Sequence, residues 1–322
     1  MSSARRGVRP RLVAVVGGVL IAMLSGGAAA VQTRINSELS AQLGDGMLAA
    51  VISFGSGLLV LLIAVLFSPG ARAGLAQLRS SVAERITPWW FLTGGLFGAV
   101  FVISQNVAAA PLGIALFTVA MVASQTVSST VVDRIGVGDL ASRPVSRLRV
   151  LAAALAVIAV VFTGLARLDV GVPLGFLILP VLAGAGIGVQ QAFNGQVRFV
   201  SGSALTATAV NFLFGTIILC VVAGAHTAVA GWPAMFPADP LLYTGGLLGV
   251  VFIGGAILVV RTIGVLLTGL GTISGQLMGA LAVDLLAPVS AHPVGVTTVV
   301  GTLVTLVAVS VAVASAQRPA TS

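Results

Sequence analysis

The residues best placed to do chemistry in this chain are two glutamines and two aspartates that recur at one spacing. Gln125 is followed eight residues later by Asp133, and Gln276 is followed by Asp284 at the same distance. All four lie within or at the ends of strongly apolar runs, where a polar side chain is costly unless it has a partner or a task. They are therefore the first candidates for a functional site.

Patterns for catalysis or metal binding do not occur in the sequence. The single cysteine, Cys220, excludes an intrachain disulfide or a cysteine-based metal cage, and His226 and His292 have no neighbouring ligands at metal spacing. There is no G-x4-G-K-[ST] phosphate-binding motif and no pair of acids at one depth. We expect no metal, no cofactor and no ATP hydrolysis, and a membrane-embedded enzyme is disfavoured.

The glutamines and aspartates belong to a duplicated segment. Residues 93–133 align with residues 244–284 at a constant offset of 151, and twelve of the 41 positions are identical. A second set of matches, at an offset of 158, relates Gln32 to Gln190, Asn36 to Asn194 and residues 44–57 to 202–215. The chain is therefore an internal duplication.

Composition predicts a membrane protein. The chain is 58% hydrophobic and 7% charged, with a mean hydropathy of +1.14, so it lacks the polar residues to cover a surface in water. A helix needs about 20 apolar residues to cross the hydrocarbon core. Ten such runs can be drawn: Leu12–Val31, Met47–Phe67, Trp89–Ala110, Leu112–Ile135, Leu148–Ala166, Val172–Gln191, Ala204–Ala225, Leu241–Val260, Ile263–Ala287 and Val296–Ser315.

The arginines indicate the orientation of these helices. With both termini in the cytoplasm, 14 of the 16 arginines fall on the cytoplasmic side, and only Arg34 and Arg167 fall outside. The net charge of +8 therefore reflects topology, and we expect no nucleic-acid partner. The first run imitates a signal peptide, but its match to residues 182–190 places it in the repeat as an uncleaved helix.

The fold class that follows is an all-α polytopic membrane protein of two inverted repeats. Each repeat, residues 1–168 and residues 169–322, holds five of the ten helices. Because five is odd, the second repeat enters the membrane from the opposite side, which is a transporter architecture.

The glutamines and the aspartates are expected at different depths in the membrane. Gln125 lies about 18 Å into a helix entered from outside and Gln276 equally deep in one entered from inside, so both fall near the bilayer midplane, where inverted-repeat transporters bind substrate. The alternative is that they only bridge helices by hydrogen bonds. Asp133 and Asp284 fall near opposite membrane faces and are predicted to gate or anchor.

Further polar positions are candidates for substrate binding. The repeated Gln32, Asn36, Gln190 and Asn194 extend the first helix of each half, where they either line a vestibule or lie in a solvated loop. For the neighbouring Arg34 and Glu38 the vestibule and the solvated loop are equally favoured. Symmetry is broken elsewhere, since Gln105 and Asn106 become Ala256 and Ile257, and Ser53 becomes Asn211. Substrate-specific tuning or the capping and bridging of helices would each explain Asn211, Gln105 and Asn106.

The motifs resemble those of the YdcZ family, within the drug/metabolite transporter superfamily. They are Q-x3-N after the first helix, G-x-x-A-A-x-x-S-F-x-x-G in the second, G-G-x-x-G in the third and Q-x7-D in the fourth: Gln32/Asn36, Gly46–Gly57, Gly94–Gly98 and Gln125/Asp133. The resemblance covers residues 12–316 and looks like a fused form of a five-helix unit. It implies a multi-pass exporter of small molecules in the bacterial inner membrane.

The predicted function is a secondary transporter that exports a small organic metabolite or xenobiotic by alternating access. A non-transporting scaffold or sensor is the alternative. The predicted partners are a small-molecule substrate and the lipid bilayer. Because the two repeats are fused in one chain, a monomer could hold the whole transporter, and a homodimer is the alternative.

Overall fold

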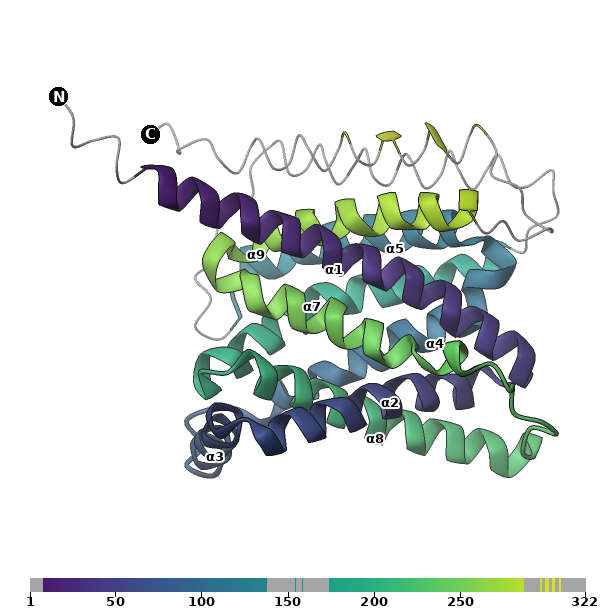
Figure 1. The fold of residues 1–322 in the computed structure, drawn as a ribbon, viewed down its shortest axis with the longest axis horizontal. Helices are drawn as coiled ribbons and strands as arrows, with labels where there is room; N and C mark the ends of the chain where they lie inside the picture. The colour runs from purple at the N-terminus through teal and green to yellow at the C-terminus, as the bar shows by residue number, and fades with distance from the viewer. Residues whose placement is uncertain are drawn as a thin grey trace.

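The chain folds into a bundle of helices. The computed structural model describes residues 8–137 and 174–286, together with eight single positions between 154 and 307. Within those ranges the regular elements are α-helices and short 3-10 helices, and no strand occurs. Most of the long helices run along one direction, side by side (Figure 1). The expected all-helical class is confirmed for the described ranges.

The first half begins with a long helix and a capped turn. Asp45 caps the second helix by accepting hydrogen bonds from the backbone N–H groups of Met47 and Leu48, at 2.9 and 3.0 Å. Gly113, at φ +79°, permits the tight turn that separates the expected spans Trp89–Ala110 and Leu112–Ile135. The elements are α1 (Val8–Leu43), α2 (Gly46–Phe67), α3 (Pro69–Ala83), η1 (Trp89–Thr93), α4 (Gly94–Leu112) and α5 (Ile114–Ile135).

The second half repeats the first turn with different residues. Gly202 at φ +65° and the helix-capping Ser203 occupy the places of Gly44 at φ +67° and Asp45. The hydroxyl of Ser203 accepts from the N–H of Thr206 at 3.1 Å. The elements are η3 (Leu174–Leu177), α7 (Ile178–Ser201), α8 (Ala204–Ala230), η4 (Pro240–Tyr243) and α9 (Gly245–Leu286).

The long helix α9 is a hairpin of two arms. Ser25 lies against Gly255, yet the next residue of α1, Gly26, lies against Thr272 and Gln276. In one straight helix, positions 255 and 272 would be about 25 Å apart. The chain therefore reverses between them, as the α9 ribbon does in Figure 1, and the boundary between the expected spans Leu241–Val260 and Ile263–Ala287 falls in this interval.

The described ranges account for most of the expected spans. Six helices are long and apolar enough to cross a membrane, and two shorter apolar helices, Leu116–Val132 and Gly271–Leu286, accompany them. Of the expected helices at 148–166 and 296–315 the structure describes only eight single positions, so the count of ten stays a prediction.

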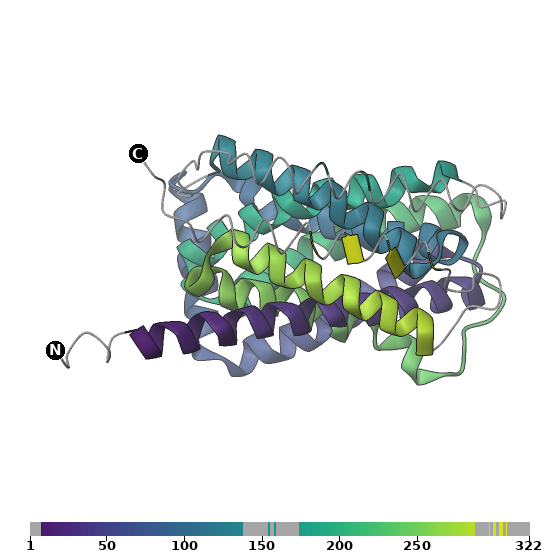
Figure 2. The same ribbon diagram turned by 90° about the horizontal axis from the view of Figure 1, so that it is seen from above.

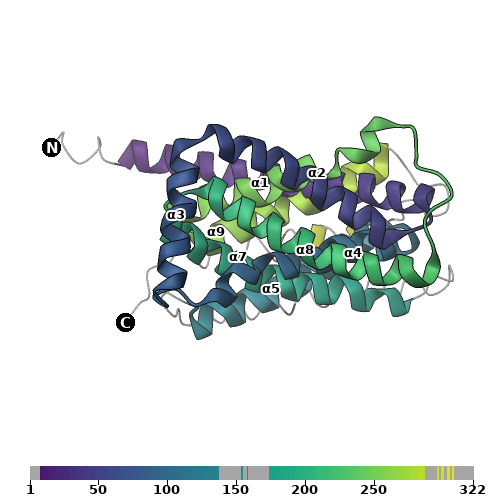
Figure 3. The ribbon, with the colours of Figure 1, turned by 90° about the horizontal axis from the view of Figure 1, so that it is seen from below.

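One helix was not predicted from the sequence. In Figure 3, α3 lies across one end of the bundle, at a steep angle to α2 and α8. Its buried positions Ala71, Gly74 and Leu78 recur at helical spacing, while Arg72 and Arg79 are exposed. The start signal was available, since Ser68 caps the helix and Pro69 occupies its first turn.

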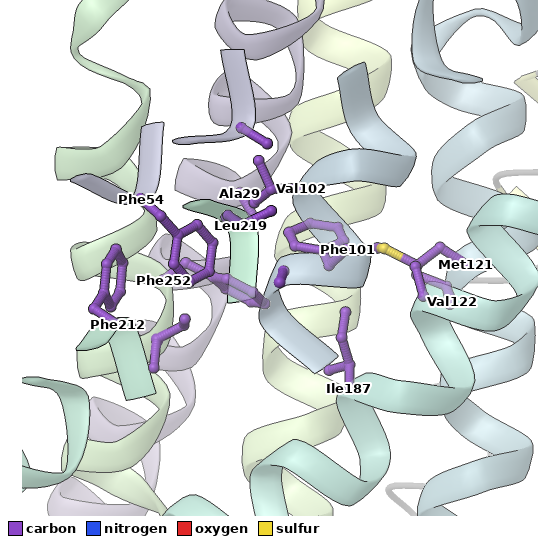
Figure 4. Close-up of a cluster of buried hydrophobic side chains, with 14 of the residues drawn as sticks. Ala29, Phe54, Phe101, Val102, Met121, Val122, Ile187, Phe212, Leu219 and Phe252 are labelled. Atoms are coloured by element: carbon purple, nitrogen blue, oxygen red, sulfur yellow. The ribbon is translucent and has the colours of Figure 1, made fainter. Parts of the chain in front are cut away.

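Equivalent residues of the two halves meet in the core. The rings of Phe54 and Phe212, related by the 158 offset, stack with centroids 4.8 Å apart, and those of Phe101 and Phe252, related by the 151 offset, lie 5.9 Å apart (Figure 4). Such aromatic pairs contribute about 0.5–1.5 kcal/mol each beyond the area that they bury. The contacts of α2 and α8 run in opposite directions along the chain, because Phe54 lies against Gly215 and Phe212 against Gly57.

The first helix of each half packs on the third and fourth helical segments of the other half. Helix α1 lies along both arms of α9, as Figures 1 and 2 show for the second arm, and α7 lies along α4 and α5. Glycines allow the backbones to touch, since a Cβ on Gly26 would overlap the carbonyl oxygen of Thr272, and one on Gly184 that of Met121. Thr272 and Met121 are themselves equivalent, so the contacts are reciprocal.

Candidate functional site

The two glutamines of the repeated motif are enclosed in protein. Gln125 is 0% exposed and Gln276 is 1% exposed. Neither the amide nitrogen nor the amide oxygen of either residue has a hydrogen-bond partner within the described part of the chain. Leaving a buried polar group unpaired costs about 1–3 kcal/mol. These four amide atoms therefore have hydrogen-bonding capacity that the described part of the chain does not use.

A polar cluster in the first half joins α1 to α4. The amide nitrogen of Asn36 donates to Oε1 of Gln105 at 2.9 Å, and Nε2 of Gln105 donates to the hydroxyl of Thr33 at 2.7 Å. The Thr33 hydroxyl in turn donates to the carbonyl of Ala29 at 2.8 Å. The three polar side chains are at most 2% exposed, so the cluster closes this end of the α1–α4 contact.

The second half forms its polar cluster with a different helix. Nε2 of Gln190 donates to Oδ1 of Asn211 at 3.2 Å, and Nδ2 of Asn211 donates to Oδ1 of Asn194 at 2.9 Å. Asn211 comes from α8, whereas Gln105 comes from α4. The two departures from symmetry that the sequence showed are thus two ways of binding the repeated asparagine, which is Asn36 in one half and Asn194 in the other.

Another pair of equivalent contacts lies next to these clusters. The hydroxyl of Ser40 donates to the carbonyl of Asn106 at 3.0 Å. At the equivalent place in the second half, the guanidinium of Arg198 donates to the carbonyl of Ile257. Asn106 also donates from its side chain to the carbonyl of Gly46 at 2.9 Å. Sequence analysis did not single out Ser40, Arg198 or Thr33 for any of these contacts.

A cavity lies between α7 and the two arms of α9. Its enclosed volume is about 30 Å³, room for a small polar group or a few water molecules, and the empty space including the open mouth is about 430 Å³. Three amide side chains face an otherwise mostly apolar wall. The lining includes Gln190, Gln191 and Asn194 from α7 and Phe252, Ala256 and Thr268 from α9.

The equivalent place in the first half is closed. The eleven residues that line the cavity have counterparts at the two offsets, and every counterpart is at most 5% exposed. Gln105 stands there in the position that Ala256 has in the cavity. One half therefore contains an amide-lined space, and in the other half a glutamine side chain takes its place.

The structure places the remaining candidates as follows. Gln32 is buried, and its amide lies against Gly249 as that of Gln190 lies against Gly98. Arg34 and Glu38 are half-exposed and form an ion pair of 3.7 Å within α1, which continues as helix through the predicted extension. Asp284 is buried near the end of α9. The side chain of Asp133 lies outside the described residues.

Other polar groups fit the expected ends of the helices. His226, in the last part of α8, lies 3.8 Å from the carboxylate of Asp45, so both mark one end of the bundle. Trp89, Trp90 and Trp232 are exposed, as expected for an aromatic belt. No group of three metal-ligating side chains occurs among the described residues.

Comparison with known proteins supports the fold. A crystal structure described only as that of a protein superposes with a TM-score of 0.62 at 17% sequence identity, covering 95% of this chain and 98% of the other. At that identity the likeness concerns the fold alone. A search of the curated proteins finds no match.

The decisive comparison is with a protein family. The family described as "Putative inner membrane exporter, YdcZ" matches residues 17–162 and again residues 175–311. This chain belongs to the YdcZ family. It carries the family's unit twice, and the match confirms the family resemblance that the motifs indicated. Membership of the YdcZ family and the apolar helices make the chain a multi-pass inner-membrane protein of the exporter type.

Proposed function

We propose that this chain is a secondary transporter that exports a small organic metabolite or xenobiotic by alternating access between two inverted halves, residues 1–168 and 169–322. The observation that carries the proposal is the difference between two equivalent places. An amide-lined cavity lies between α7 and α9, while its counterpart between α1 and α4–α5 is closed. Alternating access requires that one such place is open while the other is closed.

The direction of the helices supports inversion. Helices α2 and α8 are equivalent at the 158 offset, and their contacts run antiparallel. A two-fold axis across the bundle would pass between Phe54 and Phe212 and between Phe101 and Phe252. In the orientation that the arginines favour, the cavity then opens to the cytoplasm, and the closed cluster faces outside.

The substrate site in this proposal is the cavity together with the enclosed glutamines. Gly184 brings α7 against α5, because a Cβ there would lie 2.9 Å from the backbone nitrogen of Gln125. One turn further along α7, Ile187 lines the cavity. The unpaired amides of Gln125 and Gln276 would hold the substrate as it passes the centre. Asp133 and Asp284 would gate or anchor, and a single chain would suffice for transport.

The rival functions fit less well. A scaffold or sensor has no need for four buried amide atoms without partners, which are costly to keep. An enzyme would need convergent titratable groups, and among the described residues the cavity wall is amide, hydroxyl and apolar.

The test is transport by the purified protein in proteoliposomes, with a broad panel of small organic compounds measured in the trapped volume. We expect saturable movement of at least one compound class, with no requirement for ATP. Liposomes without protein are the control. Inactivity over the whole panel, by protein that remains folded, would favour the scaffold.

A further inference from the structure

In the closed half, the side chain of Gln105 occupies the place that corresponds to the cavity of the other half. The side chain of Gln105 ends in a carboxamide, in which a carbonyl oxygen and an N–H donor lie side by side in one plane. The oxygen accepts from Asn36 at 2.9 Å, and the nitrogen donates to Thr33 at 2.7 Å. Because the Thr33 proton is given to the Ala29 carbonyl, the hydroxyl oxygen is the acceptor for Gln105. The surrounding residues thus accommodate one carboxamide with both of its functions bound.

The open half keeps this environment and lacks the occupant. Asn194 takes the place of Asn36, Gln191 that of Thr33 and Phe252 that of Phe101, and all three line the cavity. Ala256 takes the place of Gln105 and ends at its Cβ atom, so the rest of the side chain is missing. The cavity therefore includes the space that the carboxamide of Gln105 fills in the closed half.

The polar atoms of the open half suit the same group. Oδ1 of Asn194 is bound to Asn211 at 2.9 Å, which leaves the Nδ2 group of Asn194 to donate, as that of Asn36 does. Gln191, which replaces the hydroxyl of Thr33, offers an amide oxygen to accept an N–H. Gln190 is bound to Asn211 at 3.2 Å and holds the cluster in place.

We infer that the α7–α9 cavity binds ligands through a primary carboxamide or a urea-like group, for which Gln105 is the internal substitute in the closed half. The inference rests on the proposed function in taking this cavity as the substrate site. The rival chemistry is a carboxylate attracted by Arg198, whose guanidinium binds the carbonyl of the lining residue Ile257. An amide can bind the N–H group of Asn194 and the amide oxygen of Gln191 together, whereas a carboxylate accepts from N–H groups only and leaves the Gln191 oxygen without a donor.

The first experiment measures binding of three isosteric probes, benzamide, benzoate and acetophenone, to the purified full chain in lipid nanodiscs by ligand-observed NMR and calorimetry. We expect benzamide to bind about tenfold or more tightly than the other two, since each of them lacks one function of the amide. Benzoate binding as tightly as benzamide, or no benzamide binding, would overturn the inference.

The second experiment places a glutamine side chain in the cavity, at the position that corresponds to Gln105. Ala256→Gln should weaken benzamide binding at least about tenfold, because the new carboxamide takes the ligand's place. Ala228→Gln makes the same chemical change at an exposed position near the end of α8 and should bind as the unsubstituted chain does. Unchanged binding in folded Ala256→Gln protein would refute the assignment. If that variant does not fold, the three-probe comparison decides.

Failure of the inference differs from failure of the proposed function, because binding is measured without a gradient. Benzamide binding by a protein that transports nothing would leave the inference standing and remove the transporter. Transport of other compounds by a protein that does not bind benzamide would support the transporter and refute the inference about the carboxamide site.

Discussion

Replacing Gly26 or Gly184 with valine is expected to destabilise the protein by about 3 kcal/mol or more. A Cβ on Gly26 would overlap the Thr272 carbonyl, and one on Gly184 would overlap that of Met121. Both neighbours are backbone atoms, so the helices of the two halves would have to move apart. Thermal unfolding in detergent, followed by loss of the monodisperse peak on gel filtration, measures the effect.

Gly17→Val is the matched control on the same helix. Nothing lies within 4 Å of a Cβ at Gly17, so the same substitution should change stability by no more than about 0.5 kcal/mol. If Gly17→Val and Gly26→Val unfolded at the same temperature, the close contact of α1 with the second arm of α9 would be wrong.

The second large effect concerns function rather than stability. We expect Gln125→Leu and Gln276→Leu to fold with unchanged or slightly greater stability and to reduce transport at least about tenfold. Leucine removes two buried amide atoms that lack partners among the described residues, so the folded state loses no hydrogen bond there. Unfolding temperature and initial transport rate should be measured on the same preparations.

Asn211→Leu is the contrasting variant, because Asn211 does bridge helices. It binds both Gln190 and Asn194, so its removal should cost about 1–3 kcal/mol by leaving those two groups unpaired. If the two glutamine variants lost as much stability as Asn211→Leu, and kept full transport, the glutamines would be helix bridges and the central site would be misplaced.

The duplication could be predicted from the sequence, and the structure shows its effect on packing. Phe54 and Phe212, which are equivalent, stack on each other, and the equivalent glycines Gly26 and Gly184 make equivalent backbone contacts. In the sequence, the polar residues that follow the first apolar run are compatible with a vestibule and with a loop, because they interrupt the apolar run. In the structure, α1 continues through it to Leu43.

Two features escape prediction from hydropathy because they depend on packing. Helix α3 is too polar to register as a span and is recognised only by its cap and by the small face that it buries. The substitution of Gln105 by Ala256 was visible in the repeat, but hydropathy gives no sign that Gln105 would bind Asn36 and fill the equivalent cavity. Only the packing of the side chains around Gln105 and Ala256 shows that the first half is closed and that the second half contains a cavity.

The central claim, that one of two equivalent places is open and faces the cytoplasm, is tested most directly by cysteine labelling. Val260 lines the cavity and is half-exposed, whereas its counterpart Ala109 is 0% exposed. In a Cys220→Ala background, which removes the exposed native thiol, single cysteines at these positions are treated with a membrane-impermeant maleimide from each side. We predict that Val260→Cys is labelled from the cytoplasmic side and that Ala109→Cys is labelled from neither. Labelling of Val260→Cys from outside alone, or equal labelling of both cysteines, would contradict the account.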